Sequence, residues 1–188
     1  MGAVFLAVLL LLTACGNETE LGNAARLVRA MQLDRMMLVS MQIPYRRGQL
    51  RNRGNEKLEK DDVRFYECIY SIDSSIFIST YADVLAKEMS IEEMRTAIRF
   101  LEGNVGKKYV QSTMVLLPEV FGLPELANKS KVELSKEELA AVEKFTQTAA
   151  GKKLWQKEIF EQKSVLFAAA AKWQDAVNGC VRSTQEKK

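Results

Sequence analysis

Histidine is absent from this chain of 188 residues. Its absence excludes Ser-His-Asp and Cys-His catalysis, imidazole metal sites and the usual side-chain switch between about pH 5 and 8. Cysteine is scarce, and Cys15, Cys68 and Cys180 lie too far apart in sequence for a thioredoxin-like motif or a zinc site. Glycine motifs that bind dinucleotides or nucleotide phosphates are also missing. We therefore predict no catalytic residue, no metal and no cofactor.

Long hydrophobic runs are missing too, and the one apolar run is short. Residues 3–12, AVFLAVLLLL, fall well below the roughly 20 residues that cross a bilayer. Leu12-Thr13-Ala14-Cys15 follows directly, and no Lys or Arg precedes the run. The segment resembles a bacterial lipoprotein signal peptide, whose lipobox cysteine is lipidated and becomes the first mature residue. This resemblance predicts a signal peptide over 1–14 and lipidation of Cys15; a buried N-terminal helix or strand is the alternative.

The residue after the predicted cleavage site bears on location. In Gram-negative lipoproteins an aspartate there commonly signals retention in the inner membrane, whereas this chain has Gly16. The resemblance therefore implies an exported protein that is anchored by lipid to the outer membrane and faces the periplasm. We expect one mature domain over 15–182, followed by a charged tail over 183–188.

Two cysteines remain after Cys15, one in the first half of the domain and one near its end. In an exported protein this even number predicts a disulfide between Cys68 and Cys180. The alternative is a pair of buried, unpaired thiols.

The chain contains an internal repeat that defines its architecture. Residues 89–111 and 134–156 align without a gap when one is shifted by 45 positions. The identical pairs are Ser90/Ser135, Glu92/Glu137, Glu93/Glu138, Phe100/Phe145, Gly106/Gly151, Lys107/Lys152, Lys108/Lys153 and Gln111/Gln156. Each copy begins with a Ser-x-x-Glu capping box, and apolar residues at helical spacing follow it. A short polar turn, Gly-Lys-Lys and a second apolar helix complete each αα-hairpin.

This pattern predicts an all-α, single-domain helical bundle built around two αα-hairpin units. We expect the second helices of the two units to pack through Tyr109/Val110 and Leu154/Trp155. The second copy also resembles the domain family of unknown function DUF2059, on the evidence of Phe145, Thr148, Gly151 and Lys152 after its capping box. Thr146, Thr148 and Ala149 replace the tyrosine, serine and proline usual in that family's turn. The resemblance implies an all-helical, exported bacterial protein and carries over no catalytic residue.

The remaining segments are also predicted to be helical. Asn17–Met41 has an apolar face with four methionines, which favours core packing over a copper(I) site. Pro44 is predicted to end that helix, and Val63–Ser71 to form the next. From Gly151 we expect one long helix, whose middle, residues 165–171, is apolar on all sides and should be the most buried segment. A charge at Leu166 should therefore destabilise the domain severely.

Two basic regions are candidate anion-binding sites. One is the stretch predicted to be a loop after Pro44, with Arg46, Arg47, Arg51 and Arg53. The other comprises the Gly-Lys-Lys helix starts, with Lys107, Lys108, Lys152 and Lys153. The alternative is that all eight side chains are merely solvated. The formal net charge is only +3, and no basic stripe with interleaved aromatics predicts nucleic-acid binding.

Three functions agree with these features. The first is a lipid-anchored module that binds or scaffolds an envelope partner, such as an envelope protein or anionic lipid. The second is a carrier of an apolar or lipidic ligand, which a cavity lined by Trp155, Phe121 and methionines would favour. The third is a carboxylate-based envelope hydrolase, which requires two buried acids facing one cleft. We name these functions in order of decreasing expectation, so an enzyme is the least expected.

Overall fold

The computed structural model describes residues 20–55, 60–120, 132–155, 160 and 162–185. Over these residues the protein is all-α, and they include no strand. The predicted signal peptide, Cys15 and Phe121 lie outside the described part of the chain. The all-α prediction is confirmed.

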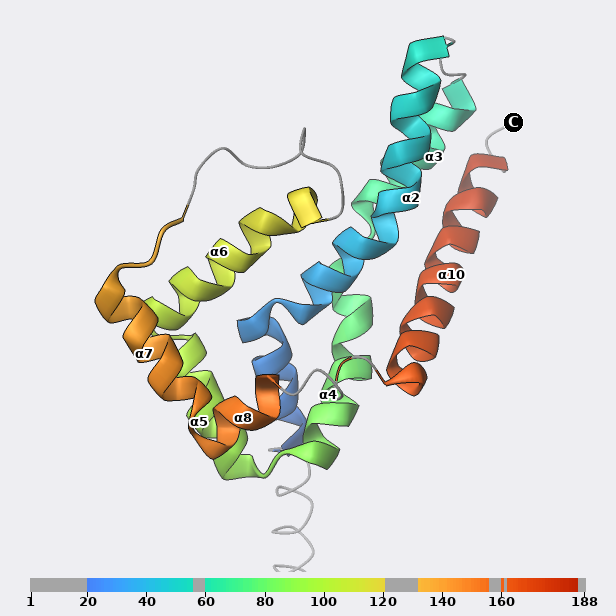
Figure 1. Ribbon diagram of the computed structural model, residues 1–188. Helices are drawn as coiled ribbons and strands as arrows, with labels where there is room; N and C mark the ends of the chain where they lie inside the picture. The colour runs from blue at the N-terminus through green and yellow to red at the C-terminus, as the bar shows by residue number, and fades with distance from the viewer. Residues whose placement is uncertain (1–19, 56–59, 121–131, 156–159, 161, 186–188) are drawn as a thin grey trace, which may run out of the picture.

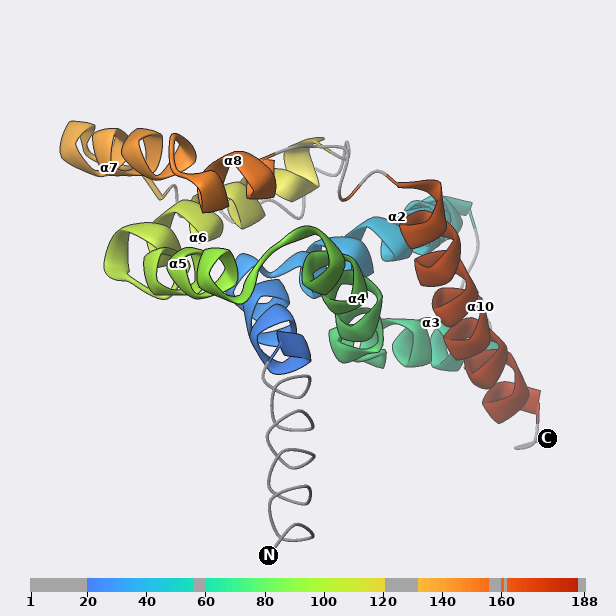
Figure 2. The same cartoon turned by 90° about the horizontal axis from the view of Figure 1, so that it is seen from below.

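The helices form two groups around a shared core (Figures 1 and 2). Residues 20–31 are helical and lie between the groups. The first group contains α2 (Leu33–Asn55), α3 (Lys60–Ser71), the 3-10 turn η1 (Ser74–Phe77), α4 (Ile78–Glu88) and α10 (Lys163–Gln185). The second contains α5 (Ile91–Leu101), α6 (Asn104–Val120), α7 (Lys136–Thr146) and α8 (Ala149–Trp155). One cluster of buried apolar side chains runs through both groups, so a single core holds them together.

Both predicted capping boxes are present. The Ser90 amide donates to the Glu93 carboxylate at 2.8 Å, and the Glu93 amide donates to the Ser90 hydroxyl at 3.3 Å. The equivalent distances for Ser135 and Glu138 are 2.7 and 3.3 Å. These bonds satisfy amides that the first turns of α5 and α7 leave without helical partners. The two αα-hairpins, α5–α6 and α7–α8, therefore begin as the repeat predicts.

The segment predicted as one helix over Asn17–Met41 is helical from residue 20, but it is divided at Gln32, and its predicted end at Pro44 is wrong. Gln32 has a positive φ of 56° and separates residues 20–31 from α2. Such a left-handed residue is a common way for a helix to end. Beyond it α2 runs through Pro44 to Asn55, so the arginine-rich stretch is helical and not a loop.

Tertiary contacts on both sides of Pro44 explain why α2 survives it. A proline inside a helix removes one backbone hydrogen bond. The buried Gln42 amide donates to the Ile69 carbonyl at 3.0 Å. The Tyr45 ring lies 6.0 Å from Phe65 and 5.7 Å from Trp173, measured between centroids. These contacts hold α2 against α3 and α10 at the place where Pro44 removes one of the helix's own backbone hydrogen bonds.

The single long helix predicted from Gly151 is also wrong. The structure places α8 and α10 in different groups, and Gln162, directly before α10, is not helical. At its other end α10 continues through Ser183 and Thr184 to Gln185, into the predicted charged tail. Helix α6 likewise contains a proline, since it continues through Pro118 to Val120.

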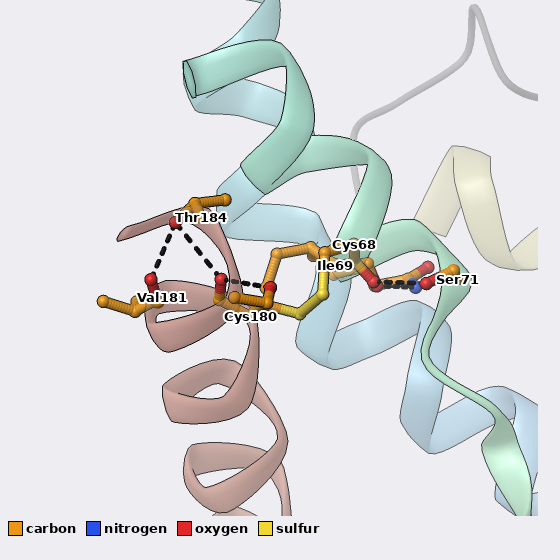
Figure 3. Close-up of a disulfide and its surroundings, with 8 residues drawn as sticks. Cys68, Ile69, Ser71, Cys180, Val181 and Thr184 are labelled. Atoms are coloured by element: carbon orange, nitrogen blue, oxygen red, sulfur yellow. Dashed lines mark hydrogen bonds between the residues drawn. A yellow bond between two sulfur atoms is a disulfide. The ribbon is translucent and has the colours of Figure 1, made fainter. Parts of the chain in front are cut away.

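The disulfide between Cys68 and Cys180 is present, with an S–S distance of 2.06 Å (Figure 3). It joins α3 to α10 across a sequence separation of 112. Cys180 is buried and Cys68 half-buried. The bond therefore fixes the last helix of the described chain to the first group.

The prediction that residues 165–171 form the most buried segment is wrong. Leu166 is 45% exposed and Phe167 73% exposed. Helix α10 packs mainly against α3, α4 and η1, and it does so along one stripe. The buried stripe consists of Val165, Ala169, Trp173, Val177 and Cys180. A charge at Leu166 consequently has access to water, and the severe destabilisation expected of Leu166→Asp does not follow.

Candidate ligand-binding site

The two repeat units pack against each other through equivalent residues. Phe100 and Phe145, which occupy the same position in the two units, stack with centroids 4.0 Å apart and an interplanar angle of 6°. Helix α5 packs on α8, and α6 packs on α7. Each contact thus has a counterpart with the units exchanged, as in the isologous interface of a two-fold dimer.

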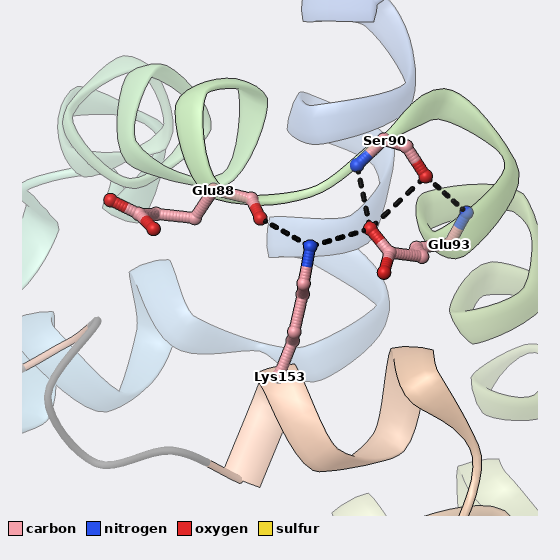
Figure 4. Close-up of polar contacts among 4 residues, drawn as sticks. All are labelled: Glu88, Ser90, Glu93 and Lys153. Carbon is pink, nitrogen blue, oxygen red and sulfur yellow. Dashed lines mark hydrogen bonds and ion pairs between the residues drawn. The ribbon is translucent and has the colours of Figure 1, made fainter.

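Two ion pairs repeat this exchange. Lys153, in the second unit, donates to the Glu93 carboxylate and to the Glu88 carbonyl, both at 2.9 Å (Figure 4). Lys108, in the first unit, donates to the Glu138 carboxylate at 2.6 Å. In both cases the second lysine of Gly-Lys-Lys reaches the capping-box glutamate of the other unit. The motif therefore joins the two units.

Both glutamates have a pKa below the ordinary value. For Glu93 the main cause is the hydrogen bond from Lys153, followed by the Ser90 amide. For Glu138 it is the hydrogen bond from Lys108, followed by the Ser135 amide. Because the folded state lowers these pKa values, the stabilisation is complete above the ordinary value of 4.5. It is lost as the pH falls through the lowered values.

We predict that Glu93→Gln combined with Glu138→Gln makes unfolding less dependent on pH below about pH 5. Glutamine keeps the capping boxes, so the change isolates the ion pairs. Thermal melts between pH 2.5 and 7 measure the effect, with Glu92→Gln as the matched control. The Glu92 side chain is 77% exposed and pairs only with Arg95, one turn away on the same helix. An unchanged pH profile in the double variant would show that the pairs do not hold the units together.

A cavity of about 230 Å³ lies where the paired units meet residues 20–31 and α2. Its wall combines side chains from both units with two methionines from the N-terminal helices. The lining residues are Met31, Met36, Leu101, Tyr109, Val110, Thr113, Leu154 and Trp155. None of them is charged. The Tyr109 and Trp155 rings lie 5.7 Å apart, so this predicted pair is in contact. The main packing between the units is nevertheless between α5 and α8 and between α6 and α7, and not between the two second helices.

The residues that line the cavity differ in how far they are buried. Leu101, Val110 and Leu154 are buried, with 1, 7 and 3% of their surface exposed. The other lining residues are half-buried, and they include every residue with a polar side-chain group, namely Tyr109, Thr113 and Trp155. The most buried part of the lining is thus apolar, and its polar groups belong to half-buried residues.

The eight candidate anion-binding residues do not form one site. Lys108 and Lys153 are engaged by glutamates, whereas Lys107 and Lys152 are exposed. The arginines lie on the C-terminal half of α2, away from the starts of α6 and α8 in both views (Figures 1 and 2). Their surroundings also differ. Arg46 stacks over the Tyr70 ring, 4.7 Å from its centroid, and Arg47 also has an interaction partner. Arg51 is exposed, and the Arg53 side chain is outside the described part.

A second hollow lies beside the disulfide and is more polar. It is lined by Arg64, Glu67, Cys68, Ser71, Ser183 and Thr184. Its three hydroxyls donate to backbone carbonyls of their own helices, at 2.8, 2.9 and 3.2 Å. None of its described lining residues has a buried side-chain polar atom without a hydrogen bond, so the apolar cavity is the better candidate.

Sequence reasoning identified one wall of the cavity and missed the other. Tyr109, Val110, Leu154 and Trp155 were predicted to face each other because of their equivalent places in the repeat. Met31 and Met36 were assigned to an ordinary apolar face. Only the turn at Gln32, which places them on separate helices, brings both to the cavity.

Other classes of site find no support in the described residues. They hold no group of three or more acidic or cysteine side chains that could bind a metal ion. Among the helices described, none combines the length and apolar character needed to cross a membrane. A scan against known protein families and searches of curated proteins and of solved structures each find no match to this chain. The resemblance to DUF2059 stays a prediction.

Proposed function

We propose that this protein is a lipid-anchored envelope protein that binds an apolar ligand between its helices and catalyses no reaction. The observation that carries the proposal is the uncharged cavity built from both repeat units, residues 20–31 and α2. Cavities of this kind, apolar with a few polar groups, are the usual form of small-molecule sites. The lipoprotein-type N-terminus supplies the expected location, the outer membrane facing the periplasm.

The contacts favour this function over the other two hypotheses. A scaffold for anionic partners would use the Gly-Lys-Lys lysines, but half of these hold the units together. A carboxylate hydrolase needs paired acids in one cleft. The obvious candidates, Glu93 and Glu138, serve capping boxes and ion pairs, and no acid lines the cavity within the described chain.

The two tryptophans allow a direct test. Trp155 lines the cavity, whereas Trp173 lies on α10 beside Tyr45. A Trp173→Phe variant therefore reports only on the cavity, and Trp155→Phe serves as the matched control. We expect 1-bromooctane, an apolar probe with a heavy-atom quencher, to quench the fluorescence of Trp155 saturably and to leave that of Trp173 nearly unchanged.

Saturable quenching is the sign of a site, because random collision quenches in proportion to the probe concentration. The cavity-filling change Val110→Phe should abolish the saturable part. Equal, non-saturating quenching of Trp155 and Trp173 would contradict the proposal.

A further inference from the structure

The buried and half-buried lining residues differ in chemistry, and we take the former to form the closed end of the cavity and the latter its rim. The buried ones, Leu101, Val110 and Leu154, present only aliphatic side chains. A hydroxyl or charged group placed there would lose its water without gaining a hydrogen bond, which is strongly unfavourable. The ligand must therefore enter with an apolar end.

The rim offers hydrogen-bonding groups that the described protein does not use. The Tyr109 hydroxyl and the Trp155 indole N–H make no hydrogen bond with any described residue. The Thr113 hydroxyl donates to the Tyr109 carbonyl at 3.2 Å and can still accept. Two donors and an acceptor thus belong to half-buried residues of an otherwise apolar lining.

The size of the cavity limits the part of the ligand that it encloses. An engineered apolar cavity of about 150 Å³ binds benzene, which has six carbons. By simple proportion, 230 Å³ holds about nine carbons. That is enough for a medium alkyl chain or a fused bicyclic ring, and too little for two acyl chains.

We infer that the cavity binds an uncharged, single-tailed amphiphile of about nine carbons, with its tail toward Leu101, Val110 and Leu154 and one polar group at Tyr109, Thr113 and Trp155. This inference rests on the proposed function and adds the class and orientation of the ligand. A long-chain alcohol and the monoacyl ester of a small polyol share this chemistry. Because no described lining residue is charged, a neutral polar group is favoured over a carboxylate or phosphate.

The test uses three ligands of equal length, octane, 1-octanol and 1,8-octanediol, as competitors of 1-bromooctane at Trp155 in the Trp173→Phe protein. We expect 1-octanol to compete best. The diol should bind about 10- to 100-fold more weakly, because its second hydroxyl must be buried unpaired at the closed end. Tyr109→Phe, which keeps the ring contact with Trp155, should weaken 1-octanol about three- to tenfold and leave octane unchanged.

Octanoate at pH 8 and octylphosphate distinguish a neutral from an anionic polar end, and both should bind more weakly than 1-octanol. The inference is overturned if the diol equals 1-octanol, if either anion binds best, or if Tyr109→Phe weakens octane as much as 1-octanol. In each of these cases saturable quenching by 1-bromooctane still supports an apolar site. Without such quenching the proposed function itself fails.

Discussion

Alanine at Gly106 or Gly151 is expected to destabilise the domain by about 3 kcal/mol or more, the upper end for overpacking. A Cβ atom at Gly106 would lie 2.2 Å from the Phe100 carbonyl oxygen, and one at Gly151 would lie 2.1 Å from that of Phe145. Both clashes are with the backbone of the preceding helix, which cannot move without opening the hairpin. Urea unfolding followed by circular dichroism measures the loss.

Two other glycines provide controls. Gly179 has nothing within 4 Å of an added Cβ and lies inside α10, so Gly179→Ala should stabilise by about 0.5–1 kcal/mol through helix propensity. Gly103, where the nearest atom would be 3.1 Å away, should give an intermediate loss. If Gly151→Ala were as stable as Gly179→Ala, the close approach of the two helices in the second hairpin would be wrong.

Removing the disulfide is expected to cost about 4–5 kcal/mol at most. The chain-entropy model gives this value for a loop of roughly 100 residues, and measured losses are commonly about 2–5 kcal/mol. The loss of stability should be greatest in α10, because that helix is otherwise held by one stripe of apolar side chains. Hydrogen exchange of α10 amides in a Cys68→Ala/Cys180→Ala protein measures it.

A matched control is to add a reductant both to the original protein and to the double variant. Dithiothreitol should destabilise the original protein by about the same amount as the double substitution, and should not affect the variant. Protection of α10 that is unchanged in the variant would show that packing alone anchors this helix.

Local features of the fold could be predicted because neighbouring residues determine them. Ser90 with Glu93, and Ser135 with Glu138, are three residues apart, so their capping boxes follow from sequence. The disulfide follows from the number of cysteines and the expected compartment. The pairing of Tyr109 with Trp155 follows from the repeat.

The remaining features depend on tertiary contacts that sequence spacing does not reveal. Pro44 stays inside α2 because Gln42 and Tyr45 are held by α3 and α10. The exposed side of α10 at Leu166 and Phe167 could not be recognised, because apolar composition does not tell how many neighbours a helix has. The same holds for Lys108 and Lys153, whose partners lie 30 and 60 residues away.

The duplicated unit gives the cavity its physical basis. Each unit supplies a second helix to the cavity, and the exchanged ion pairs join that helix to the first helix of the other unit. The Phe100–Phe145 stack fills the centre of the interface, while Leu101, Val110 and Leu154 leave space beside it. The two units thus act together as one wall of a binding site.

Native mass spectrometry of the full chain, produced in bacteria and extracted gently from the envelope, tests the central claim most directly. One spectrum gives the mass of the processed chain and of any bound molecule. The Val110→Phe variant is the control for lipid that binds non-specifically. We predict a chain that begins at acylated Cys15 and carries one small apolar molecule, which is absent from the variant. A chain without a bound molecule, or the same molecule on the cavity-filled variant, would contradict the account.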